Sequence, residues 1–250
     1  MIPLKVWIFI ALANMSANAA PLVLQSSNRQ TSLLELYTSE GCSSCPPAEA
    51  WFSRLKSSPG LWTEFVPVAF HVDYWNHLGW RDPWSKEEYS DRQRLYASAW
   101  RAENIYTPEF VLNGQEWRHG LFQKEVPAST GTNAGVLKVS TTDAKSWQVL
   151  YFPPPAENAV YEIHAALLSG ELDSDVKAGE NAGSRLQHDF VAVSFTELPL
   201  LNRTNVCRAT FALSAPTNGL AGRMAFAAWI TSGNETEPVQ AVGGWVSMPQ

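Results

Sequence analysis

The chain has 250 residues, of which 45% are hydrophobic and 17% charged, a composition typical of a globular protein. Lysine and arginine number 18 against 24 acidic residues, which gives a formal net charge of −6. This acidity argues against nucleic acid or an anionic membrane surface as the partner.

Residues 1–19 have the pattern of a secretory signal peptide. A short start containing Lys5 precedes a mostly apolar run from Val6 to Met15, and Ala17-Asn18-Ala19 supplies small residues for cleavage. The apolar run is too short for a permanent membrane anchor, and a buried N-terminal strand or helix is the alternative. We therefore expect an exported chain, periplasmic or secreted, without a membrane anchor.

Strands and helices are predicted to alternate in the first half of the mature chain. The expected elements are a buried strand at 32–38, a helix beginning at Pro46-Pro47, an apolar strand at 65–73, a helix at 86–102 and a hairpin at 110–117. Asn113-Gly114 in the hairpin is a strong signal for a tight two-residue turn. This order predicts an α/β arrangement.

The composition changes between residues 126 and 135, where proline, serine, threonine and glycine indicate a linker. Beyond it the pattern predicts mainly strands, at 136–140, 147–152, 161–168, 190–195, 207–213, 223–230 and 239–246. We expect a domain at residues 32–130 followed by a mainly antiparallel, β-sandwich-like domain at 135–250.

Cys42 and Cys45 form a Cys-x-x-Cys motif between a predicted strand and a predicted helix. A cysteine at a helix N-terminus lies near free N–H groups and the positive end of the helix dipole, which favour a thiolate. Cys42 is then the candidate nucleophile for disulfide exchange, and Cys45 the residue that resolves the mixed disulfide. The pattern predicts a redox-active pair.

Three other interpretations of the pair stay open. Structural zinc needs two further cysteine or histidine ligands at recognisable spacing, and the five histidines are scattered singly, so no metal site is predicted. A Cu(I) clip needs fewer ligands, and a static disulfide needs none. The third cysteine, Cys207, falls in an alternating strand pattern and is expected to be buried and inert.

Thr107-Pro108 stands between the second predicted helix and the hairpin. With the upstream order of strand, Cys-x-x-Cys and helix, it resembles the thioredoxin superfamily. The resemblance implies a thioredoxin-like fold for the first domain and a cis bond before Pro108. It also implies that Thr107 and Pro108 lie against the cysteines and bind the substrate, which is a protein thiol or disulfide or a redox partner protein, with no cofactor.

Longer segments narrow this resemblance to one family. The segments Glu35 to Pro47, Ala69 to Trp75, Leu78-Gly79-Trp80, Tyr106-Thr107-Pro108 and Gly179 to His188 look like the exported bacterial proteins known as domain of unknown function 1223. That family carries a thioredoxin-like domain. The resemblance supports fold and compartment and names no substrate.

Further candidates lie near the strand ends. His71 and Asp73 end the second predicted parallel strand, at the sheet edge where ligands bind in α/β proteins, although each could satisfy only local contacts. Thioredoxin has a buried acid six positions before its first cysteine, whereas Leu36 occupies that position here. Glu35 is a proton acceptor only if it turns inward, because adjacent strand residues face opposite sides. The roles of Glu180-Asn181 and His188-Asp189 stay open between binding and turn geometry.

Overall fold

The computed structural model describes residues 21–247 except 119–124, 128, 130, 156–158, 204, 217–221 and 234. The predicted signal peptide at residues 1–19 lies outside the described residues. Within the described part of the chain, no helix combines the length and the apolar character needed to cross a membrane.

The first half forms the predicted alternation of strands and helices. After β1 (Leu22–Gln25) come β2 (Ser32–Thr38), α1 (Cys45–Arg54) with a short 3-10 turn (Leu55–Ser57), β3 (Phe65–His71), a second 3-10 turn (Asn76–Leu78), α2 (Glu87–Trp100), β4 (Glu109–Leu112) and β5 (Gln115–Glu116). Pro46 and Pro47 lie in the first turn of α1, where a missing N–H removes no helical hydrogen bond. Asn113 and Gly114 have φ values of 49° and 79°, which confirms the tight hairpin turn.

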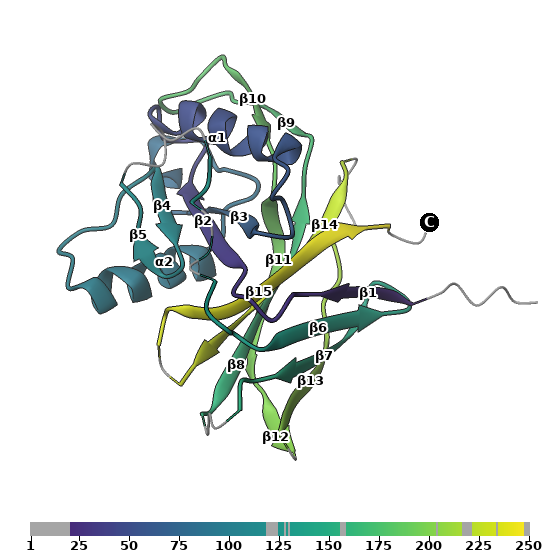
Figure 1. Cartoon of the computed structure of the whole chain (residues 1–250). Coiled ribbons are helices and arrows are strands. Elements are labelled where there is room, and N and C mark those ends of the chain that lie inside the picture. Colours follow the sequence, from purple (N-terminus) through teal and green to yellow (C-terminus); the bar gives the residue numbers. More distant parts are fainter. Residues whose placement is uncertain are drawn as a thin grey trace, which may run out of the picture.

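The second half contains strands and no α-helix in its described residues. These strands are β6 (Val136–Thr141), β7 (Ser146–Phe152), β8 (Tyr161–Ser169), β9 (Leu172–Asp175), β10 (Arg185–His188), β11 (Val191–Pro199), β12 (Leu201–Arg203), β13 (Val206–Ala212), β14 (Met224–Ser232) and β15 (Pro238–Val246). β1, β6, β7, β13 and β12 form a five-stranded antiparallel sheet, and β9 pairs with β10 in a hairpin beside α1 (Figure 1).

The expected fold class, a thioredoxin-like α/β domain followed by an antiparallel sandwich, is wrong. Among the described residues, strand is far more abundant than helix, with two α-helices, and β2 to β5 do not form a sheet of their own. They belong to one eight-stranded mixed sheet with the order β15-β14-β8-β11-β3-β2-β4-β5 (Figure 1). The two halves meet where β11 pairs with β3 in parallel, with Val191 opposite Ala69.

The physical reason lies in β3, which is buried along its whole length. A central strand needs hydrogen-bond partners on both edges. β2 supplies one edge and β11, from far along the chain, supplies the other. Because β11 belongs to the second half of the sequence, local patterns do not indicate that it pairs with β3. The predicted domain boundary between residues 130 and 135 stays a prediction.

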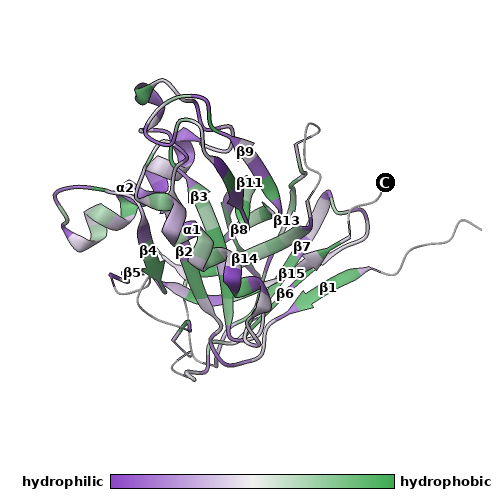
Figure 2. Cartoon of the chain, turned by 90° about the horizontal axis from the view of Figure 1, so that it is seen from above, coloured by the Kyte–Doolittle hydropathy of each residue, from purple (hydrophilic) through white to green (hydrophobic). Residues whose placement is uncertain are grey.

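Two apolar cores stabilise this arrangement. One lies between the helices and the eight-stranded sheet and includes Phe52, Phe70 and Trp229. The other lies between the two large sheets, where the rings of Trp147 and Phe226 stack with centroids 3.9 Å apart. Hydrophobic strands β2 and β3 run through the interior in Figure 2. The buried Cys207 belongs to the second core, as its strand pattern predicts.

Candidate functional site

Two parallel strands bring the site together. In β2 and β3 the final residues, Thr38 and His71, are register partners, so both chains leave the sheet at the same edge. Residues 39–44, here called the cysteine loop, connect β2 to α1, whose first residue is Cys45. Cys42 and Cys45 are both buried free thiols. The carboxyl edge of the sheet therefore carries the cysteine pair.

The environment of Cys42 favours its thiolate. A hydrogen bond from the Cys45 thiol lowers the pKa of Cys42 to about 6, against the opposing effect of burial and with help from Ser44 and Thr107. Ser44 Oγ lies 3.2 Å from the Cys42 sulfur and can donate to the thiolate, whereas the Thr107 carbonyl oxygen, 3.6 Å away, accepts a hydrogen bond from the protonated thiol. At neutral pH a thiol with this pKa is mostly ionised.

Cys45 has the opposite electrostatics. Burial and the neighbouring Cys42 raise its pKa well above the usual value, while a hydrogen bond with the Thr38 side chain partly opposes the shift. The two thiols of the pair therefore differ in acidity, with the lower pKa at Cys42 and the higher at Cys45. This division is the one that exchange through a mixed disulfide needs.

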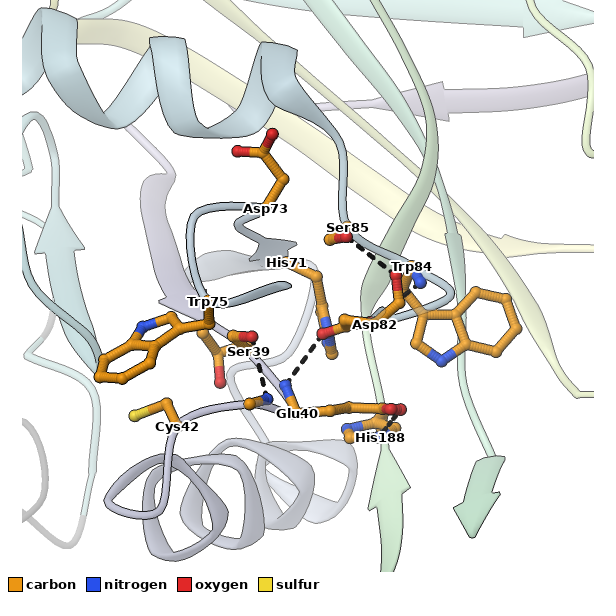
Figure 3. A network of polar contacts seen from close by, with 12 residues as sticks. Ser39, Glu40, Cys42, His71, Asp73, Trp75, Asp82, Trp84, Ser85 and His188 are labelled. Atoms are coloured by element: carbon orange, nitrogen blue, oxygen red, sulfur yellow. Dashed lines mark hydrogen bonds and ion pairs between the residues drawn. The ribbon is translucent and has the colours of Figure 1, made fainter. Parts of the chain in front are cut away.

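Thr107 lies against the cysteine pair, and Pro108 follows it directly in the chain. The Thr107–Pro108 peptide bond is cis, as the resemblance implied. The Thr107 hydroxyl accepts a 2.7 Å hydrogen bond from the indole nitrogen of Trp75, and Figure 3 shows this indole on the same side as the Cys42 sulfur. Gly41 lets Trp75 approach, because a Cβ at Gly41 would lie 2.9 Å from that of Trp75.

The loop between β9 and β10 holds the cysteine loop from the other side. Asn181 Nδ2 donates 2.9 Å hydrogen bonds to the backbone carbonyls of both Glu40 and Cys42. The Glu180 carboxylate accepts the backbone N–H of Ser43 at 2.9 Å. Glu180 and Asn181 therefore both bind the backbone of the cysteine loop through their side chains.

Five buried ionisable residues form a cluster beneath the cysteine loop, here called the acid–imidazole cluster: Glu40, Glu49, His71, Asp82 and His188. His71 Nδ1 lies 2.7 Å from Asp82 Oδ2. His188 contacts two carboxylates, with Nε2 3.0 Å from Glu40 Oε1 and Nδ1 against Glu49 Oε2. Burial opposes a charge on His188, but Glu49 and Glu40 raise its pKa to about 10. Figure 3 shows the His71 ring extending toward His188 and Glu40.

The cluster is linked to the cysteines through neighbouring groups. The Thr38 hydroxyl, which contacts Cys45, donates a 2.5 Å hydrogen bond to Glu49 Oε1. The backbone N–H of Glu40 donates to Asp82 Oδ2 at 2.9 Å, and the Trp80 indole donates to Glu40 Oε2 at 2.6 Å. These hydrogen bonds connect the acid–imidazole cluster to the cysteine loop and to Cys45.

Two of the predicted supporting residues lie elsewhere. Glu35 forms a buried ion pair with Arg92 of α2, with a distance of 2.8 Å between Oε1 and Nε, and accepts a hydrogen bond from Tyr96. Asp73 accepts a 2.5 Å hydrogen bond from Ser90, also in α2. Both carboxylates are therefore bound by residues of α2, whereas His71 lies in the acid–imidazole cluster.

Sequence reasoning missed three members of this cluster: Glu40, Glu49 and Asp82. Glu40 precedes Cys42 by two residues. Glu49 follows Cys45 by one helical turn, so Cys45 and Glu49 lie on one face of α1. These signals were readable. Asp82 follows an irregular segment, and no local pattern connects it to His71.

A family model described as protein of unknown function DUF1223 matches residues 33–231. Two solved structures share the fold. A protein from Agrobacterium tumefaciens, determined by X-ray crystallography, is 22% identical with a TM-score of 0.57, covering 88% of this chain and 96% of that chain. HBP35 of Porphyromonas gingivalis is 12% identical with a TM-score of 0.62, covering 88% and 76%. No curated protein matches significantly. At these identities the structural likeness concerns the fold alone.

Proposed function

We propose that this chain, which belongs to the DUF1223 family, exchanges thiols and disulfides with client proteins through Cys42 and Cys45. We further propose that it acts after export, in the periplasm or as a secreted protein, because residues 1–19 have the pattern of a signal peptide. Disulfides persist in these compartments.

The observation that carries the proposal is the opposite electrostatics of two adjacent thiols. The pKa of Cys42 is lowered to about 6 and that of Cys45 is raised. Neutral pH then favours attack by Cys42, while Cys45 keeps its proton until it is needed. A purely structural pair has no need of this difference.

The proposed reaction with a client disulfide has two steps. The Cys42 thiolate attacks one client sulfur, which forms a mixed disulfide and releases the other client sulfur as a thiolate. Cys45 then gives its proton to the client thiolate released in the first step and attacks the Cys42 sulfur. This breaks the mixed disulfide, forms the Cys42–Cys45 disulfide and releases the second client sulfur as a thiolate, which takes a proton from water. The client is reduced and the pair oxidised, so turnover in this direction requires a second dithiol protein as reductant. The reverse sequence oxidises a client.

Access to Cys42 passes its exposed neighbours. Cys42 itself is 1% exposed, whereas Ser43 and Ser44 beside it are exposed. We propose that the client enters along these serines and displaces the contacts of Cys42 with Thr107. In this arrangement Thr107 and Pro108 form the wall against which the client backbone lies.

The test traps the mixed disulfide. A full-length Cys45→Ser variant is expressed with export, quenched in acid and alkylated, and its disulfide-linked partners are separated on non-reducing gels. Partners that disappear on reduction, and that are absent from a Cys42→Ser/Cys45→Ser control, support the proposal. Redox titration of the wild-type pair against glutathione should give a potential above about −300 mV.

Two results would overturn it. Absence of trapped partners together with a potential below about −300 mV indicates a stable structural disulfide. Stoichiometric, tight Cu(I) binding by the reduced wild-type pair without exchange activity assigns the sulfurs to copper handling instead.

A further inference from the structure

The acid–imidazole cluster contains a set of side chains suited to a metal ion. One ring nitrogen from each of His71 and His188 and one carboxylate oxygen of Glu49 lie within 4.8 Å of one another. All three residues are buried. They come from β3, β10 and α1, so the sheet, the second-half hairpin and the first helix meet at this point.

One nitrogen of this set lacks a hydrogen-bond partner. Among the described residues, buried His71 Nε2 has none, while Nδ1 of the same ring binds Asp82. The space lined by His71, Glu49 and His188 continues along the apolar side chains of Leu36 and Phe52 and admits no water-sized sphere. A buried polar atom without protein or water partners is costly, and this ring points toward the cluster (Figure 3).

Both histidines are oriented as metal ligands are. Asp82 holds the Nδ1 side of His71 and leaves Nε2 facing the cluster. Glu40 holds Nε2 of His188 at 3.0 Å and leaves Nδ1 facing Glu49. Metal-binding histidines almost always use their second nitrogen in this way, on a carboxylate, carbonyl or water. Here each of the two rings has its own carboxylate.

We infer that Glu49, His71 and His188 bind a divalent transition-metal ion beneath the cysteine loop. Two imidazoles and a carboxylate match the ligand preferences of Zn²⁺ and related ions. This inference does not depend on the proposed redox function.

Small side-chain movements would complete the geometry. Ligand atoms about 2.1 Å from a tetrahedral ion are about 3.4 Å apart. Donor atoms now as much as 4.8 Å apart would draw together by up to about 1.4 Å, whereas Glu49 Oε2 and His188 Nδ1, which are already in contact, would move apart to admit the ion. Binding replaces the Glu49–His188 contact with two metal bonds and releases a proton where the imidazole carried one. The ion would then cross-link α1, β3 and β10.

The first experiment uses the metal alone. Full-length protein is stripped with a chelator, and Zn²⁺ binding is measured by calorimetry, with Co²⁺ as a spectroscopic substitute. We expect one ion per chain, a melting temperature that rises with Zn²⁺ concentration, and a Co²⁺ spectrum without the sulfur-to-metal charge-transfer absorption that thiolate ligands produce. Absence of this charge-transfer absorption would distinguish binding at the acid–imidazole cluster from binding at the cysteine pair without any mutation.

Variants test the ligands individually. His71→Gln should weaken Zn²⁺ binding by more than about 100-fold, and Asp82→Asn, which removes only the orienting carboxylate, by about 10- to 100-fold. His164→Gln is the matched control, since His164 is also buried and held by a carboxylate, that of Glu197, but lies outside the cluster. It should bind as the wild type does.

The inference is overturned if stripped wild-type protein binds neither Zn²⁺ nor Co²⁺ stoichiometrically. It is equally overturned if Co²⁺ shows thiolate charge transfer, or if a folded His71→Gln variant binds Zn²⁺ undiminished. If His71→Gln fails to fold, X-ray absorption of the Zn²⁺-loaded wild type decides, because two imidazoles and an oxygen ligand are expected and sulfur ligands contradict the site.

Discussion

Replacing Cys45 with alanine should raise the pKa of Cys42, because the Cys45 thiol is the main group that stabilises the Cys42 thiolate. A hydrogen bond to a charged group contributes about 1.5–3 kcal/mol, and one pKa unit corresponds to about 1.36 kcal/mol. Losing this donor should therefore move the pKa of Cys42 from about 6 to about 7–8. Burial of the sulfur works in the same direction.

The assay is the pH dependence of iodoacetamide alkylation at Cys42, followed by mass spectrometry of the reduced protein. At pH 6 about half of wild-type Cys42 is thiolate. In the variant the fraction falls to about 1–10%, so alkylation should slow by about 5- to 50-fold. Cys45→Ser is the matched control, since a hydroxyl still donates a hydrogen bond and should hold the midpoint closer to the wild-type value. A Cys45→Ala midpoint equal to that of the wild type would refute the reasoning.

Three further predictions concern stability. Arg92→Leu leaves Glu35 buried without its cation and should lower the free energy of unfolding, measured in urea, by about 3–5 kcal/mol. The Glu35→Leu/Arg92→Leu double variant should recover much of this loss, and absence of recovery would contradict the ion pair. Burial raises the pKa of Glu109 to about 7, so ionisation of Glu109 disfavours the folded state. The melting temperature of the wild type should therefore fall as the pH rises from about 4.3 through 7. Glu109→Gln should remove this decline. An unchanged slope would show that Glu109 is not its source. Asn181→Ala, which frees two carbonyls of the cysteine loop, should cost about 1–3 kcal/mol and speed amide exchange in that loop, and unaltered exchange would argue against these hydrogen bonds.

The cysteine site was predictable where the chemistry is local. Cys42 and Cys45 are separated by two residues at the start of a helix, and that spacing alone brings the sulfurs together. Thr107 contacts them from another part of the chain, and only the family resemblance pointed to that contact. Glu35 shows the limit of such analogy, because strand alternation turns it to Arg92 on the α2 side.

Local sequence by itself determined several elements of this protein: apolar runs became β2 and β3, Pro46-Pro47 began α1, and Asn113-Gly114 closed the hairpin, whereas β1, β9, β10 and β12 were not predicted. Each predicted element depends on the conformational preferences of neighbouring residues. The tertiary structure alone decided that β11 pairs with β3 and that His188 meets Glu49. A strand edge or a buried charged group needs a hydrogen-bond partner that is close in space, and that partner can come from any part of the chain.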